Sequence, residues 1–149
     1  MVKAKNFNET DIFRSTVILF KNCYEKVKNM QTDVKIDIGH NLLQCIRNCG
    51  EYAKLSYIEC KENKRLKLKY MILANKEISK AEFDLNLIVS CCLFPGKIKH
   101  NESQEVYING GSEISKNIGE LKIQINDFIS SLKDKLTKEE IDNIYFSLL

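Results

Sequence analysis

Residues 111–132 read GSEISKNIGELKIQINDFISSL, and this stretch decides the fold. Its apolar and small positions recur in alternating steps of three and four residues: Gly111, Ile114, Ile118, Leu121, Ile125, Phe128 and Leu132. This spacing is a heptad seam, which places these residues on one side of a helix. Such a seam favours packing against neighbouring helices at the shallow crossing angle of a bundle.

Three further stretches, all N-terminal to this seam, show the same helical periodicity. The expected core positions are Phe13, Val17, Phe20, Tyr24 and Val27, then Ile38, Leu42, Cys45, Cys49 and Tyr52, then Leu66, Tyr70, Leu73, Ile78, Ala81, Leu85, Ile88 and Cys92. Pro95-Gly96 ends the third of these stretches, because proline cannot continue a helix. The pattern predicts long helices over residues 11–29, 34–61, 64–92 and 102–134.

Capping residues mark where these helices begin. Thr10 and Asp11 are suited to cap the first helix, and Thr32 or Asp33 the second. Thr137-Lys138-Glu139-Glu140 is a capping box, which opens a short tail helix over residues 138–147. Four long helices with short links predict a single all-α domain over residues 1–149, an up-down-up-down four-helix bundle with a short C-terminal tail helix.

Composition argues against membrane insertion, secretion and a structural metal site. No stretch approaches the roughly 20 apolar residues that a membrane span needs, and no signal peptide is recognisable, so we expect a cytoplasmic protein. The six cysteines include Cys45 and Cys49, four apart, and the adjacent Cys91 and Cys92, but no repeated C-x-x-C spacing. We therefore expect free thiols packed as small hydrophobic groups, with no zinc and no disulfide.

Catalytic patterns are also absent from the sequence. Asp37-Ile38-Gly39-His40 is at most half of the paired motif that a di-iron bundle requires, and no histidine follows an arginine at the spacing of a helical RNase. Asn109-Gly110-Gly111-Ser112, which falls within the fourth predicted helix, lacks the lysine of a phosphate-binding loop. We expect no catalytic residue, no metal and no cofactor in this chain.

Positive charge gathers at one place in the chain. The net charge is only +3, but residues 54–80 carry +5 whereas residues 81–149 carry −4. Lysines at a helix start oppose the helix dipole, which suggests that the cluster has a use. The candidate nucleic-acid-binding residues are Lys54, Lys61, Lys64, Arg65, Lys67, Lys69 and Lys76. The alternative interpretation is a solvated helix face that keeps the protein soluble.

Several short segments together resemble one protein family. They are Tyr24, Ile38-Gly39, Glu51-Tyr52-Ala53, the basic stretch before Tyr70-Met71-Ile72-Leu73-Ala74, Tyr107, Glu113-Ile114 and Ile118-Gly119-Glu120-Leu121. Over residues 13–132 their order and spacing resembles the four-helix proteins that include the ribosomal RNA intervening-sequence proteins and Avd. Avd is the accessory protein of diversity-generating retroelements.

The resemblance implies a ring-shaped homo-oligomer, typically a pentamer, that associates with a reverse transcriptase and with RNA. In such an assembly the basic stretch would contact phosphates. Ile18 and Leu19 lie beside the first apolar stripe, and such surplus apolar surface marks either a subunit interface or a broadly buried helix. The alternative function is a protein–protein interaction adaptor of a mobile element or phage, which binds no RNA or DNA.

Overall fold

The computed structural model describes residues 6–59, 62–95, 97–101, 104–108 and 111–149. The long helices are α1 (Asp11–Val27), α3 (His40–Lys54), α4 (Lys64–Ser90) and α5 (Gly111–Lys133), and the tail helix is α6 (Lys138–Ser147). The shorter elements are the 3-10 turn η1 (Phe7–Glu9), α2 (Thr32–Val34), the π-helical turns η2 (Lys35–Gly39) and η3 (Leu55–Glu59), and strands β1 (Lys97–Asn101) and β2 (Gln104–Ile108).

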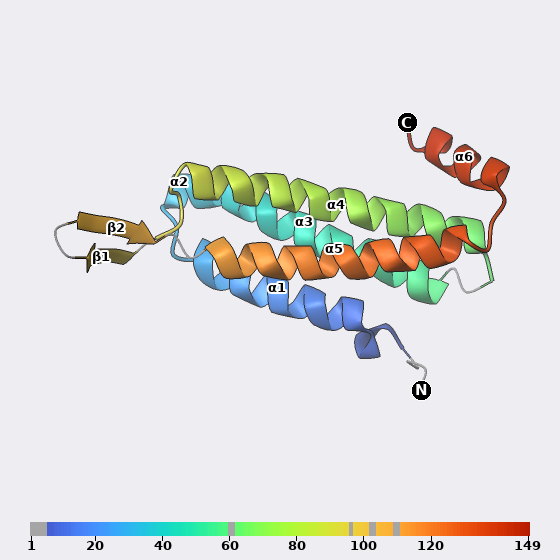
Figure 1. Cartoon of the computed structure of the whole chain (residues 1–149), viewed down its shortest axis with the longest axis horizontal. Coiled ribbons are helices and arrows are strands. Elements are labelled where there is room, and N and C mark those ends of the chain that lie inside the picture. Colours follow the sequence, from blue (N-terminus) through green and yellow to red (C-terminus); the bar gives the residue numbers. More distant parts are fainter. Residues whose placement is uncertain (1–5, 60–61, 96, 102–103, 109–110) are drawn as a thin grey trace.

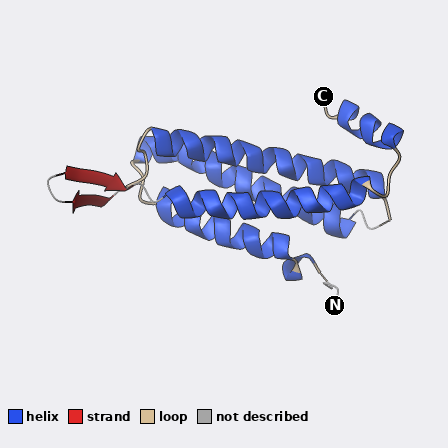
Figure 2. Cartoon of the chain, viewed as in Figure 1, coloured by secondary structure: helices blue, strands red, loops and turns tan. Residues whose placement is uncertain are grey.

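The four long helices form a bundle in which α1 and α4 each pack against both α3 and α5. The link between α1 and α3 and the β-hairpin lie at one end of the bundle (Figure 1). The link between α3 and α4 and the tail helix α6 lie at the other end (Figure 1). The described chain is therefore a helical bundle with a tail helix, as predicted. Figure 2 shows that it also carries a β-hairpin, which was not predicted.

The seam on α5 forms its side of the core. Gly111, Ile114, Ile118, Leu121, Ile125, Ile129 and Leu132 are buried. Only the sixth predicted position differs, because Phe128 is half-buried and Ile129 lies deeper. The heptad pattern therefore predicts the buried side of α5 correctly, except that near the C-terminal end this side is shifted by one residue from Phe128 to Ile129.

The first helix faces the core with a different stripe from the predicted one. α1 buries Ile12, Leu19, Cys23 and Val27. Val17 and Tyr24, which the sequence placed in the core, are about half exposed. The other three predicted residues do contact the core, since Val27 is buried and Phe13 and Phe20 are partly buried against it. Both stripes are apolar at helical spacing, so periodicity alone cannot decide which of them faces the bundle. The unburied stripe leaves apolar side chains on the outer surface of α1.

The start of the fourth predicted helix was wrong. β1 and β2 pair antiparallel, with Lys97 opposite Ile108 and Asn101 opposite Gln104, where the sequence analysis extended a helix back to residue 102. The run Val106-Tyr107-Ile108 is β-branched and aromatic, which favours a strand over a helix. α5 accordingly begins at Gly111, so Gly111 and Ser112 form its first turn, whereas Asn109 and Gly110 lie outside the described residues.

Side-chain caps fix the starts of three helices. The Thr10 hydroxyl oxygen accepts a hydrogen bond from the Phe13 N–H at 3.1 Å, and Asn63 caps α4 in the same way at Leu66, also at 3.1 Å. The capping box of α6 is complete, since Thr137 and Glu140 each accept from the other's backbone N–H. The predicted cap of the second helix was wrong, because residues 32 and 33 are themselves helical and no side chain caps that start.

Buried and half-buried polar contacts join neighbouring helices in register. The Asn41 side-chain N–H donates to Asp84 Oδ2 at 2.6 Å, which ties α3 to α4 where Asp84 is buried. Asn22 donates to Asn117 at 2.8 Å, which ties α1 to α5. Because a buried polar group is costly without its partner, each contact resists a sliding of one helix along the other.

Two glycines offer a matched test of the packing. A Cβ on Gly39 would lie 2.9 Å from Val27 Cγ1 and 3.2 Å from Met30 Sδ, whereas a Cβ on Gly119 would meet nothing within 4 Å. We expect Gly39→Ala to lower the free energy of unfolding by about 1–3 kcal/mol through overpacking. Gly119→Ala, in the middle of α5, should raise it by about 0.5–1 kcal/mol. Urea denaturation measures both, and equal effects of the two substitutions would contradict the packing described.

Candidate nucleic-acid interface

The residues that α4 buries determine which of its residues lie on the opposite, outer side. The buried residues of this helix are Leu68, Met71, Ala74, Ile78, Ala81, Asp84, Leu85 and Ile88. At 3.6 residues per turn, Lys69, Lys76 and Phe83, which are seven residues apart, lie together on the opposite side. Lys76 and Phe83 are exposed and Lys69 is partly exposed. We call Lys69, Lys76, Lys80 and Phe83 the outer stripe of α4.

Two lysines of the outer stripe carry charge that no described partner neutralises. Lys69 and Lys76 make no ion pair within the residues that the structure describes. Lys80 differs, because its ammonium lies 3.1 Å from Glu77 Oε1, and this hydrogen bond raises the pKa of Lys80. Positive charge on the stripe is therefore concentrated at Lys69 and Lys76, two helical turns apart.

Phe83 adds an exposed aromatic ring to the outer stripe, and the sequence analysis missed it. The ring is 63% exposed, and with Lys76 and Lys80 it lines a hollow of about 420 Å³ over α4 and the start of α3. Phe83 follows Lys76 by seven residues, a spacing that places both on one side of a helix and is visible in the sequence. An aromatic face beside lysines is the usual means of holding a single-stranded base and its phosphate.

Lys67, which is partly exposed, is directed toward two aromatic rings rather than along the outer stripe. Its ammonium lies 5.7 Å from the centre of the Phe128 ring and 6.0 Å from that of Tyr57. Its carbonyl oxygen accepts a hydrogen bond from the buried Ser56 hydroxyl at 2.7 Å. Lys67 precedes Met71 by one turn, so its Cα lies on the core side of α4 and its charge is directed to aromatic faces.

Arg65 is also engaged within the chain. Its Nε lies 2.6 Å from Glu140 Oε2, and this pair joins the start of α4 to the tail helix α6. Hydrogen bonds from the Thr137 backbone and from Arg65 lower the pKa of Glu140. The Arg65 side chain is 68% exposed, so the contact is an accessible surface ion pair between the guanidinium and α6.

The other predicted residues lie at the end of the bundle near η3. Lys54 ends α3 and Lys64 begins α4, and both are exposed without an ion pair among the described residues. Lys61 lies outside the described residues. Of the six predicted residues that the structure describes, Arg65 and Lys67 therefore make contacts within the chain. The other four have no described ion pair and could contact a ligand: Lys54, Lys64, Lys69 and Lys76.

Acidic residues of α6 border the start of α4. A hollow of about 430 Å³ is lined by Arg65, Glu139, Glu140, Asn143, Ile144 and Ser147. Its carboxylates lower the electrostatic potential around Arg65, at the first turn of α4. Lys69 and Lys76 lie further along the helix. At a rise of 1.5 Å per residue, their positions along the helix axis are about 6 Å and 16 Å from that of Arg65. Lys76 therefore lies farther from the carboxylates of the tail helix than Arg65 does.

The cysteines divide into buried and exposed groups. Cys23, Cys45 and Cys49 are buried, and burial raises the pKa of Cys23 and Cys49 to about 12 and that of Cys45 to about 11. These thiols stay protonated at neutral pH and are poor nucleophiles. The expectation of packed cysteines was wrong for Cys91 and Cys92, which are exposed in the turn after α4, and Cys60 lies outside the described residues.

Metal-binding and membrane-spanning features are absent from the part of the chain that the structure describes. No group of three or more histidine, cysteine, aspartate or glutamate side chains converges there to hold a metal ion, and His40 is exposed at the start of α3. No described helix has the length and apolar composition to cross a membrane. Comparisons with protein-family models, with curated proteins and with solved structures found no match.

The Arg65–Glu140 contact predicts how α6 is held. Substituting Glu140→Gln should speed amide hydrogen exchange in α6 at pH 7, whereas Glu139→Gln, which removes an exposed carboxylate of the same turn, should leave it nearly unchanged. Because the folded-state pKa of Glu140 is lowered, the ionised carboxylate stabilises the folded protein. This stabilisation is fully present above the ordinary glutamate pKa and is lost as pH falls through the lowered value. Equal exchange rates in wild type and Glu140→Gln would contradict the anchoring role.

Proposed function

We propose that this chain is a non-enzymatic, up-down-up-down four-helix bundle that binds RNA through the outer stripe of α4 and acts as an accessory protein to a reverse transcriptase. One observation carries the proposal. Lys69 and Lys76 face outward, opposite the buried side of α4 and without described ion pairs, and an exposed Phe83 continues their line. Lysine with an exposed aromatic ring suits single-stranded nucleic acid better than it suits an acidic protein surface.

A single chain with so few lysine contacts should bind RNA only weakly. Each lysine that neutralises a phosphate releases a condensed counterion, but two to four such contacts give modest affinity at physiological salt. Strong binding therefore requires several copies of the stripe on one RNA, since a second contact by a linked site acts at high effective concentration. The proposal accordingly includes a homo-oligomer, which the family resemblance places at five copies.

The outer side of α1 supports assembly. Val17, Ile18 and Tyr24 are about half exposed, and the Tyr24 ring stacks on that of Phe20 with centroids 6.2 Å apart. A mostly apolar hollow of about 390 Å³ between α1 and α3 is lined by Thr16, Val17, Phe20, Lys21, Ile46 and Arg47. An apolar helix side of this kind is stabilised when another subunit covers it. It lies on α1, so assembly through it would leave the outer stripe of α4 accessible.

A second candidate function is a protein–protein interaction adaptor that binds no RNA or DNA. Exposed aromatic side chains favour it, namely Phe83 on α4 and Phe146, which is 77% exposed on α6. Under the first proposal Phe83 stacks on RNA, and Phe146 is left to contact a reverse transcriptase. RNA binding separates the two functions, because an adaptor should be indifferent to RNA at every salt concentration.

Charge reversal at Lys69 and Lys76 tests the RNA site. The variant Lys69→Glu/Lys76→Glu should bind a structured RNA with single-stranded loops at least tenfold more weakly than wild type. The slope of log affinity against log salt should become shallower by about 0.7–0.9 for each lost phosphate contact. Fluorescence anisotropy measures both quantities between about 50 and 200 mM salt.

The matched control is Lys116→Glu/Lys135→Glu, which changes net charge equally at two exposed lysines away from α4. It should keep most of the affinity, and light scattering should show that both double variants keep the wild-type oligomeric state. Equal loss of binding in the two double variants would assign the affinity to net charge and contradict the proposed site. No RNA binding by wild type would favour the adaptor.

Phe83 distinguishes single-stranded from double-stranded ligands. Phe83→Ala should weaken binding to single-stranded RNA by about 1–3 kcal/mol, because one stacked base loses its aromatic partner. Binding to a blunt RNA duplex, whose bases are stacked on one another, should change little. Phe146→Ala, which removes an exposed ring from α6, is the control. Equal effects of Phe83→Ala on both ligands would contradict base stacking.

A further inference from the structure

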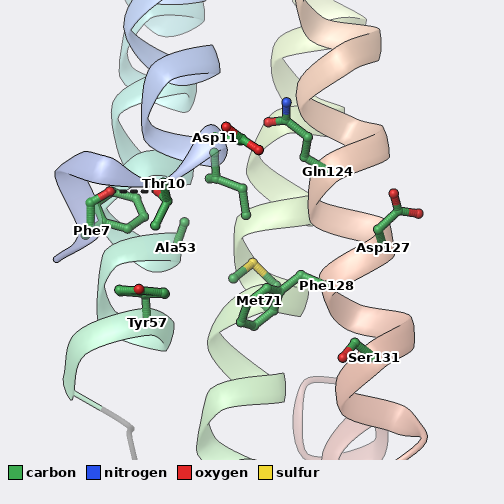
Figure 3. Close-up of a pocket in the computed structure, with 11 residues that line it drawn as sticks. Phe7, Thr10, Asp11, Ala53, Tyr57, Met71, Gln124, Asp127, Phe128 and Ser131 are labelled. Carbon is green, nitrogen blue, oxygen red and sulfur yellow. Dashed lines mark hydrogen bonds between the residues drawn. The ribbon is translucent and has the colours of Figure 1, made fainter. Parts of the chain in front are cut away.

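A second, mostly apolar site opens to solvent near the start of α1. It is a cavity of about 770 Å³, within the range of small-molecule binding sites. Its lining comes from η1, α1 and every other long helix: Phe7, Thr10, Asp11, Ile12, Ala53, Tyr57, Met71, Gln124, Asp127, Phe128 and Ser131 (Figure 3). None of these residues belongs to the outer stripe of α4, so the cavity is separate from the proposed RNA site.

The interior of the cavity is hydrocarbon. Ile12, Ala53 and Met71 are buried members of the core, and the rings of Tyr57 and Phe128 come from η3 and α5. Figure 3 shows Met71 and Phe128 close together beneath the polar residues, with Tyr57 on the other side. A ligand body placed here would contact apolar side chains contributed by several helices. The hydrophobic effect would contribute about 25 cal/mol for each Å² of apolar surface removed from water.

The polar groups at one end of the cavity accept hydrogen bonds. Gln124 Oε1 is buried and has no hydrogen-bond partner among the described residues, which is costly for an amide oxygen. The Asp11 carboxylate lies at the same end of the cavity as the Gln124 amide, whereas the Asp127 carboxylate points away (Figure 3). Asp11 is already paired with Arg14 on its outer side at 3.1 Å.

Cationic side chains are missing from the cavity lining. Neither lysine nor arginine is among the residues that line it. Lys67 is close to the same rings, but its ammonium lies over the faces of Tyr57 and Phe128 rather than at the end formed by Asp11 and Gln124. This end therefore presents the unpartnered Gln124 carbonyl beside the exposed carboxylate that Asp11 shares with Arg14, and a hydrogen-bond donor that carries positive charge would complement both.

We propose that the cavity binds a small molecule with an apolar body and an amine at one end. The body lies against Ile12, Met71 and Phe128, and the ammonium donates to Gln124 Oε1 and to the Asp11 carboxylate. An amine supplies the donor that the buried amide oxygen lacks, and its charge complements the carboxylate. A ligand of the same length that ends in a carboxylate would be repelled by Asp11 and would leave Gln124 unpartnered.

Three ligands with one chain and different head groups test the proposal. N-phenyl-1-naphthylamine, a neutral dye that fluoresces in apolar cavities, reports occupancy in the full-length protein at pH 7. Decylamine should displace the dye at a concentration at least tenfold lower than decanoate, with decanol between them, which corresponds to about 1.4 kcal/mol for the head group. No fluorescence increase with the dye, or equal displacement by decylamine and decanoate, would overturn the proposal.

Two variants and one control assign the head-group site. Gln124→Leu and Asp11→Asn should each reduce the preference for decylamine over decanol by about three- to tenfold, the effect of a lost charged hydrogen bond. Asp127→Asn is the control, because it removes the same charge from a residue that lines the cavity but points away. An equal loss in Asp127→Asn would show that net charge, and not the head-group contact, sets the preference. Circular dichroism confirms that each variant is folded.

Discussion

The burial of one side of α4 fixes the direction of every charge on its outer side. Leu68, Ile78 and Ile88 are fully buried between α3 and α5, so the helix cannot rotate about its axis without exposing them. Advancing α4 by one residue would turn it by about 100°. The Asn41–Asp84 hydrogen bond would then break, and the buried Asp84 carboxylate would lose its partner. Packing and polar pairing therefore hold Lys69 and Lys76 outward together.

The same constraint gives neighbouring basic residues different tasks. Lys67 lies on the inner side, where the rings of Tyr57 and Phe128 receive its charge, and it helps to close the bundle between η3 and α5. Arg65 holds the tail helix through Glu140. Lys69 and Lys76 take part in neither contact. The basic run looks uniform in the sequence, but its residues have three different roles. Lys67 packs against aromatic rings, Arg65 contacts α6, and we assign Lys69 and Lys76 to RNA.

The sequence predicted the features that depend on local pattern. The α5 seam, the caps at Thr10 and Thr137, and the tail helix follow from spacing and hydrogen-bonding chemistry within a few residues.

Features that depend on partners distant in sequence were not predictable in this way. α1 carries two apolar stripes of similar quality, and only α3 and α5 decide between them. Arg65 and Glu140 are 75 residues apart, so no local pattern indicates their ion pair. The cavity likewise requires knowledge of how several helices meet.

The central claim is that the fixed orientation of α4 about its axis creates the RNA-binding surface. The reactivity of individual lysines with and without RNA tests it. The protein would be acylated under limiting reagent with and without RNA, and the modified lysines quantified by mass spectrometry. The account predicts that RNA protects Lys69 and Lys76, that Lys67 reacts slowly under both conditions, and that Lys116 reacts equally in both. Protection spread evenly over these lysines, or strongest at Lys116, would contradict it.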